Sequence, residues 1–250
     1  MTLPTGFLDR PLAHRALHDA LDRRPENSLA AVKAAADRGY GIEIDVQLSR
    51  DGQVMVFHDY DLVRLTASKG YLAEYLASEL GEIKLNNGDE GIPTLRQVLN
   101  QVRGRVPLLI EIKDQDGALG PNVGVLEKAC VQALEEYSGP VALMSFNLHT
   151  LRVLAEWAPF IPRGFLTDTF TTSRWPMVPE NRRFCLDRCD HVSNPIVDFI
   201  SHRVEALDDP RVVCAKDNDK PVICWTVRSS EQAQEALKIA DVITFEGFLP

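Results

Sequence analysis

Two acidic residues lie two positions apart within one apolar segment, G-I-E-I-D-V-Q-L at 41–48. Successive side chains of a β-strand point to opposite faces, so Glu43 and Asp45 are expected to share one face of a strand. Two buried carboxylates on one face are unfavourable unless cations neutralise them. This segment alone leaves two interpretations open, because the cations could be Arg or Lys side chains of a neighbouring strand or a bound metal ion.

A third carboxylate follows the same pattern farther along the chain. Glu111 lies in the apolar run L-L-I-E-I-K, with Lys113 two positions later and close to the C-terminal end of an expected strand. Three carboxylates from two strands form an oxygen-rich site that suits Mg²⁺ or Ca²⁺, with Mn²⁺ as a further candidate, and does not suit Zn²⁺. Lys113 has two candidate roles, since its ammonium group could contact a phosphate or neutralise Glu111 directly.

Two histidines occupy comparable places, each at the end of an apolar run. His14 ends P-L-A-H and His58 ends V-M-V-F-H. A single histidine in such a place is more often structural than catalytic, but two of them accompany the three carboxylates here. Since the imidazole pKa of about 6.5 suits proton transfer at neutral pH, we interpret one histidine as a general base and the other as a general acid. The pattern does not specify which is the base, and we favour His14 as the base and His58 as the acid. Arg15 adds a planar guanidinium group that can bind a phosphate through two hydrogen bonds.

Short apolar runs alternate with longer helical patterns from one end of the chain to the other. This alternation predicts an α/β protein with a parallel sheet and crossover helices. No glycine-rich loop follows the first expected strand, so the pattern favours a (β/α)8 TIM barrel over an open doubly wound sheet. The expected strands are 12–15, 41–48, 54–58, 107–113, 141–145, 163–166, 191–193, 222–227 and 242–245, and the expected helices are 29–38, 95–103, 123–137, 150–157, 198–206 and 231–239.

One region, about 60–91, breaks the alternation directly after His58. It is long and mixed in composition, and long segments of this kind in compact domains are usually functional. We therefore expect a small insertion near the mouth of the barrel, after the second strand region. Asn27 or Ser28 is expected to cap the helix that starts near Leu29. The 250 residues are otherwise expected to form a single barrel domain.

The overall charge limits the partners that this chain can bind. Its net charge of −9 and its isoelectric point near 5.2 argue against nucleic-acid binding and against stable association with anionic membranes. Five cysteines without a C-x-x-C pair indicate free thiols in a reducing compartment. Together with an N-terminus that is unlike a signal peptide, this indicates a cytoplasmic protein whose partner is a small molecule. The oligomeric state does not follow from the sequence.

Several motifs, taken together in this order and spacing, resemble one enzyme family. The motifs are H-R near the N-terminus, P-E-N-S, G-I-E-I-D-V-Q-L-S-R-D-G, V-F-H-D, I-P-T-L and L-L-I-E-I-K, and they are dense over residues 11–113. This set is similar to that of the glycerophosphodiester phosphodiesterase family. The resemblance implies a TIM barrel with metal ligands at Glu43, Asp45 and Glu111, catalytic histidines at His14 and His58, phosphate contacts at Arg15 and Lys113, and a substrate-pocket aromatic residue at Trp225.

The activity implied by the resemblance is metal-dependent hydrolysis of glycerophosphodiesters to glycerol 3-phosphate and an alcohol such as choline. The attacking group is either water or the glycerol hydroxyl of the substrate, by way of a cyclic phosphate. Two alternatives are a lysophospholipase D or phospholipase C-like activity on lipid phosphodiesters and a non-catalytic phosphate-binding barrel. The chain departs from the family at Ala16, where a glycine is usual, and in its last strand, where D-V-I-T-F-E-G-F replaces D-G-I-x-T-D-x-P.

Overall fold

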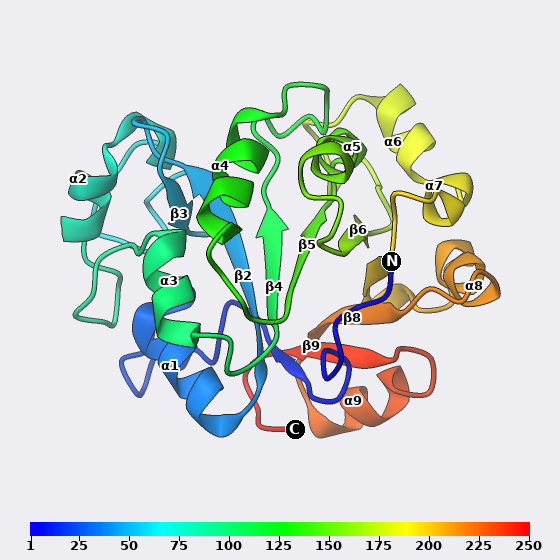
Figure 1. Cartoon of the computed structure of the whole chain (residues 1–250), viewed down its shortest axis with the longest axis horizontal. Helices are drawn as coiled ribbons and strands as arrows, with labels where there is room; N and C mark the ends of the chain where they lie inside the picture. The colour runs from blue at the N-terminus through cyan, green and yellow to red at the C-terminus, as the bar shows by residue number, and fades with distance from the viewer. The chain divides into compact units, whose positions relative to one another are not determined.

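The computed structural model describes residues 1–250, and its strands and helices alternate along the chain (Figure 1). The strands are β1 (Leu12–Ala13), β2 (Gly41–Leu48), β3 (Val54–Val56), β4 (Leu108–Ile112), β5 (Val141–Ser145), β6 (Arg163–Thr167), β7 (Phe199–Arg203), β8 (Val222–Val227) and β9 (Val242–Phe245). The helices are α1 (Leu29–Arg38), α2 (Ala77–Glu82), α3 (Leu95–Val102), α4 (Val125–Leu134), α5 (Leu148–Trp157), α6 (Glu180–Leu186), α7 (Asp190–Ser193), α8 (Pro210–Asp217) and α9 (Ser230–Ala236), with 3-10 turns η1 (Leu72–Glu74) and η2 (Val204–Ala206).

The sheet closes on itself as a parallel barrel. Its strands follow the order β1-β9-β8-β7-β6-β5-β4-β2, and β1 also pairs with β2. The predicted (β/α)8 TIM barrel is therefore confirmed. The ninth strand, β3, stands outside this closed set because it pairs only with β2, in an antiparallel register that joins Val46 to Val56. None of the helices is both long enough and apolar enough to cross a lipid bilayer.

The chain divides into two compact units. Unit 1 comprises Met1–Pro11, Asp114–Gly124 and Ala142–Pro250, and unit 2 comprises Leu12–Lys113 and Val125–Val141. Unit 2 contains β1 to β4 and α1 to α4, while unit 1 contains β6 to β9 with the helices that follow them. The expectation of one domain over the whole chain stays a prediction.

Helix α1 forms as the sequence predicts. The hydroxyl of Ser28 accepts a hydrogen bond from the amide of Ala31, which satisfies one of the free donors of the first turn. Gly39 ends the helix at a φ of 72°, in the left-handed region that favours glycine. The helix buries an alanine-rich face that includes Val32, and it packs against α3 and β2. Of the two expected caps, Ser28 is therefore the one that the structure uses.

Two expected elements in unit 1 are wrong. Residues 191–193, expected as a strand, lie in α7, and residues 198–206, expected as a helix, contain β7. The apolar residues of 197–207 fit a helical spacing, but Phe199 to His202 are buried as a strand that pairs in parallel with β6 and β8. Burial between two strands has overridden the local pattern. Helix α8 was not expected, although Asp209 as cap and Pro210 in the first turn are typical of a helix start.

The region 60–91 forms a small substructure with its own hydrophobic cluster. The buried side chains of Leu62, Leu72 and Leu80 pack together with Met55 of β3 and with Phe57. Leu72 belongs to η1 and Leu80 to α2, and Figure 1 shows α2 on the same side of unit 2 as β3. Burial of these apolar groups explains why a segment without barrel strands adopts a defined structure.

Candidate active site

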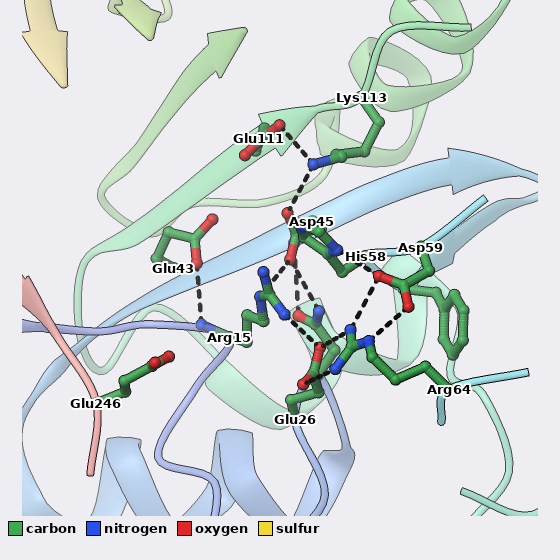
Figure 2. Close-up of polar contacts among 12 residues, drawn as sticks. Arg15, Glu26, Glu43, Asp45, His58, Asp59, Arg64, Glu111, Lys113 and Glu246 are labelled. Carbon is green, nitrogen blue, oxygen red and sulfur yellow. Dashed lines mark hydrogen bonds and ion pairs between the residues drawn. The ribbon is translucent and has the colours of Figure 1, made fainter. Parts of the chain in front are cut away.

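The three predicted carboxylates come together at one place in unit 2. Asp45 on β2 and Glu111 on β4 are direct partners in the parallel register, and Glu43 lies two residues before Asp45 on the same face. All three residues are buried, and one ligand oxygen from each lies within 4.8 Å of the others. Figure 2 shows the three side chains gathered between β2 and β4. The strand register therefore accounts for the cluster that the sequence predicted.

The electrostatics of the cluster are those of a cation site. Burial, together with repulsion from Asp45 and Glu111, raises the pKa of Glu43 well above its usual value. Burial also acts to raise the pKa of Asp45, but His58, Lys113 and Arg15 outweigh it and hold that pKa below its usual range. Three buried carboxylates offer oxygen atoms alone, which fits a hard divalent cation such as Mg²⁺, Ca²⁺ or Mn²⁺.

Two cationic side chains lie against the carboxylates. The Lys113 Nζ atom, just after the end of β4, is 2.8 Å from Glu111 Oε1 and 3.5 Å from Asp45 Oδ1. Burial alone would lower the pKa of Lys113, but Glu111 and Asp45 raise it above its usual value, so the ammonium group stays charged. Neutralisation of Glu111 by Lys113, one of the two roles expected from the sequence, is therefore present in the structure. The phosphate contact stays a prediction.

Arg15 lies at the first loop of unit 2 and contacts three acids. Its Nη1 atom is 2.7 Å from Glu26 Oε1, its Nε atom is 3.7 Å from Asp45 Oδ2, and its backbone amide donates to Glu43 Oε2 at 2.9 Å. The backbone here adopts the left-handed region, with φ values of 52° at Arg15 and 64° at Ala16. A glycine adopts this conformation without strain, which explains the physical difference between Ala16 and the glycine usual in the resembled family.

The two predicted histidines occupy different surroundings. His14 directly follows β1 and is partly buried. His58 follows β3, and its Nδ1 atom is 2.6 Å from Asp59 Oδ1. Since an ionised carboxylate only accepts hydrogen bonds, this contact places the proton on Nδ1 and leaves Nε2 as the atom for proton exchange. The catalytic roles of both histidines stay predictions.

The backbone that carries His58 is tied to the strand that carries the acids. Gln47, a buried residue of β2, donates from its side-chain amide to the carbonyl oxygens of Phe57, His58 and Asp59, at 2.9, 3.1 and 2.7 Å. Asn27 makes a comparable contact from the first loop, because its Nδ2 atom donates to Asp45 Oδ2 at 3.0 Å. Asn27 therefore orients a candidate metal ligand instead of capping α1.

Sequence reasoning missed three charged residues that the structure places beside the site. Glu26 contacts Arg15, Asp59 contacts His58, and Arg64 contacts both of these acids (Figure 2). The signal was present in the motifs P-E-N-S and V-F-H-D, where an acidic residue stands close to a functional candidate. Nothing in the spacing of residue 64 pointed to this site, because the chain brings it there through the insertion.

Trp225 belongs to unit 1, whereas the other predicted site residues belong to unit 2. It lies on β8, half-buried, and its Nε1 atom donates to the carbonyl oxygen of Ser201 at 3.1 Å. The ring centroid of Phe146 is 5.7 Å from that of Trp225 and 4.7 Å from that of Trp175. These rings form an aromatic cluster within unit 1. The role of Trp225 in a substrate pocket stays a prediction.

Comparisons with known proteins agree on one family. The family described as "Glycerophosphoryl diester phosphodiesterase family" matches residues 14–244 of this chain. A glycerophosphodiester phosphodiesterase of Caldanaerobacter subterraneus is 29% identical over 225 residues, which cover 86% of this chain and 85% of the relative.

Solved structures share the fold. A phosphodiesterase of Oleispira antarctica, in complex with the product sn-glycerol-3-phosphate, matches with a TM-score of 0.75 at 24% identity, over 98% of this chain and 93% of that protein. The glycerophosphodiester phosphodiesterase of Thermotoga maritima matches with a TM-score of 0.70 at 23% identity, over 94% of this chain and 92% of that protein. At these identities the likeness concerns the barrel architecture.

Proposed function

This chain belongs to the glycerophosphoryl diester phosphodiesterase family and is a phosphodiesterase of that class, and we propose that it hydrolyses glycerophosphodiesters to glycerol 3-phosphate and an alcohol. The observation that carries this proposal is the cluster of Glu43, Asp45 and Glu111, whose ligand oxygens lie within 4.8 Å of one another beside two cations. The product bound to the Oleispira antarctica enzyme supports glycerol 3-phosphate as one product.

The proposed metal ligands are the three clustered carboxylates. Glu43, Asp45 and Glu111 would hold a divalent cation, since their buried oxygens carry more negative charge than Lys113 and Arg15 neutralise. When bound, the cation supplies positive charge for the phosphoryl oxygens of the substrate. Burial and the acidic neighbours raise the pKa of Glu43, so its ionised form is unfavourable without a further cation nearby. A bound divalent cation would stabilise that ionised form.

Arg15 and Lys113 are the proposed phosphate contacts. Both are charged and largely buried, with side chains that are 17% and 14% exposed, so water screens them little. The guanidinium group of Arg15 can donate to two phosphoryl oxygens at once, while the Lys113 ammonium group acts as a compact charge. Their contribution is greatest in the transition state, where charge builds on the phosphoryl oxygens.

The proton transfers are assigned to the histidines. His14 takes a proton from the attacking oxygen, which belongs either to water or to the glycerol hydroxyl of the substrate. That oxygen forms a bond to phosphorus, the bond to the leaving alcohol breaks, and His58 Nε2 donates a proton to the leaving oxygen. The hydrogen bond between His58 Nδ1 and Asp59 supports this role, because it fixes the tautomer and the ring orientation of His58. If the glycerol hydroxyl attacks, water opens the cyclic phosphate in a second step.

The test is release of glycerol 3-phosphate from glycerophosphocholine, followed by a coupled dehydrogenase. We expect chelator to abolish release and Mg²⁺, Ca²⁺ or Mn²⁺ to restore it, and we expect Glu111→Gln to abolish it with every metal. Asp37→Asn is the matched control, because Asp37 is an exposed acid of unit 2 that pairs with Arg105 away from the cluster.

Two other outcomes would replace the proposal. Faster turnover of a lysolipid dispersed in detergent would assign a lysophospholipase D or phospholipase C-like activity. Metal-dependent binding of glycerophosphocholine without turnover, measured by calorimetry on folded protein, would assign a phosphate-binding barrel without catalysis.

A further inference from the structure

Arg64 contacts two acids at once, and each of those acids contacts a proposed functional residue (Figure 2). Its Nε and Nη2 atoms lie 2.6 and 2.9 Å from the two carboxylate oxygens of Asp59. Its Nη1 and Nη2 atoms each lie 2.8 Å from a carboxylate oxygen of Glu26. A single guanidinium group therefore makes two bidentate contacts, which arginine geometry allows and lysine geometry does not.

The first arm, defined as the contacts from Arg64 through Asp59, ends at His58. Asp59 uses the oxygen that Arg64 Nη2 contacts to bind His58 Nδ1 at 2.6 Å. The Asp59 side chain is only 21% exposed. Its two hydrogen bonds from Arg64 limit its freedom and compensate its charge. A histidine held in this way keeps one tautomer and one ring orientation.

The second arm, defined as the contacts from Arg64 through Glu26, ends at Arg15, the proposed phosphate contact. Glu26 accepts from Arg15 Nη1 at 2.7 Å while both of its oxygens also accept from Arg64. The Glu26 side chain is 12% exposed, and the two guanidinium groups hold its pKa below the usual value even though burial acts to raise it. Glu26 therefore stays ionised and fixes the direction of Arg15.

The insertion supplies a rigid support for Arg64. Leu62 is fully buried in the hydrophobic cluster of the insertion, and Thr66 Oγ1 donates to the Leu62 carbonyl oxygen at 2.7 Å. Asn86 bonds to this segment from the other side, since its backbone amide donates to the carbonyl oxygen of Leu65 at 2.7 Å. The backbone around Arg64 is thus fixed on both sides, although 46% of the Arg64 side chain is exposed.

We propose that Arg64 is a positioning residue that holds His58, through Asp59, and Arg15, through Glu26, in one arrangement for the reaction. The inference rests on the proposed function, because it assigns His58 and Arg15 to proton transfer and phosphate binding. It gives the insertion 60–91 a direct part in the site, since the insertion supplies the residue that couples the two. Arg64 itself does not touch the reacting groups in this assignment.

The experiment compares Arg64→Ala and Arg64→Lys with wild type in glycerophosphocholine turnover. Loss of orientation at two functional groups is expected to lower kcat/KM of Arg64→Ala by about 100-fold. Arg64→Lys keeps the charge but loses the two bidentate contacts, so its loss is expected to be smaller than that of Arg64→Ala. Added guanidinium ion is expected to restore part of the Arg64→Ala activity, because the vacated position is open to solvent, whereas ammonium ion is expected to restore less.

Arg50→Ala is the matched control. Arg50 is a unit 2 arginine of similar exposure, 55%, that pairs with Glu79 of the insertion and has no contact with Asp59 or Glu26. We expect Arg50→Ala to keep wild-type kinetics and to show no effect of guanidinium ion. Thermal unfolding of each variant verifies that the activities are compared between folded proteins.

Double-mutant cycles separate the two arms. Asp59→Asn is expected to act mainly on kcat and Glu26→Gln mainly on KM, and each effect is expected to shrink when Arg64 is already alanine. Full additivity, or equal kinetics for Arg64→Ala and Arg50→Ala in an active wild-type background, would overturn the inference. An inactive wild type with every metal would instead overturn the proposed function.

Discussion

Replacing Glu43 with glutamine is expected to stabilise the metal-free protein while removing its response to metal. The Glu43 carboxylate lies within 4.8 Å of oxygens from Asp45 and Glu111, with little solvent between them. Two unit charges at that distance repel by about 3 kcal/mol at an effective dielectric constant of about 20. Partial protonation of Glu43 relieves part of this repulsion, so we expect a gain of about 1–3 kcal/mol in unfolding free energy.

The gain should depend on pH in a defined direction. The pKa of Glu43 is raised in the folded protein, so the stability that its protonated form provides is present below the unfolded value of 4.5 and is lost as pH rises toward the folded value. Glutamine carries no charge at any pH and is free of this loss. The difference between Glu43→Gln and wild type should therefore be small near pH 5 and larger near pH 8.

The assay is urea-induced unfolding of chelator-treated protein, followed by circular dichroism, at pH 5 and at pH 8. Mg²⁺, Ca²⁺ or Mn²⁺ added to the buffer should stabilise wild type, because a cation that binds only the folded state shifts the equilibrium toward it. Glu43→Gln should show little of this stabilisation and little turnover. A stability lower than that of wild type without metal at pH 8 would refute the account of the cluster as a repulsive cation site.

Glu127→Gln serves as the control for this prediction. Glu127 of α4 is also fully buried in unit 2 but does not belong to the carboxylate cluster. Its replacement should give no gain in stability after chelation and should leave the stabilisation by metal unchanged. An equal gain in Glu127→Gln and Glu43→Gln would mean that loss of any buried charge stabilises the chain, without a role for the cluster.

The remaining predictions concern the proton transfers, the buried ammonium group and the first loop. His14→Ala and His58→Ala should each lower kcat by about 10²–10⁴-fold without lowering Tm, while His191→Ala, at a half-buried position in unit 1, should keep wild-type turnover. Lys113→Met should destabilise the metal-free protein in urea by about 3 kcal/mol, because it leaves two buried carboxylates without that partner, and an unchanged midpoint would contradict this. Ala16→Val should cost about 1–2 kcal/mol or more at a φ of 64°, measured by the same unfolding assay, whereas Ala16→Gly should be tolerated.

The carboxylate cluster could be predicted because it depends on two short-range properties of the sequence. Alternation along β2 places Glu43 and Asp45 on one face, and the position of Glu111 near the end of an apolar run places it at the C-terminal end of β4. Both properties survive folding because β4 and all of β2 except its last residue, Leu48, are buried. The sequence could not specify the register that makes Asp45 and Glu111 direct partners.

The parts that could not be predicted depend on contacts distant in sequence. Arg64 joins Glu26, 38 positions away, only because the hydrophobic cluster of the insertion fixes the backbone between residues 62 and 66. The apolar residues of β7 fit both a helical and a strand period, and only the pairing of β7 with β6 and β8 decides between them. Local sequence patterns specify neither the contact between Arg64 and Glu26 nor the strand conformation of β7.

Gln47 of β2 makes three hydrogen bonds to the carbonyl oxygens of residues 57–59. The same strand therefore positions both the candidate metal ligands and the backbone of His58. Glu43, Asp45 and Gln47 are alternate residues of one strand, so a displacement of β2 moves the candidate metal ligands and His58 together. Substitutions on the face of β2 that carries these three residues should therefore change metal affinity and proton transfer in parallel. Substitutions within 60–91 should instead change proton transfer and phosphate binding, through the contacts of Arg64 with Asp59 and Glu26, and should leave the three carboxylates in place. The insertion is therefore the part of the chain that selection or engineering can alter without disrupting the cation site.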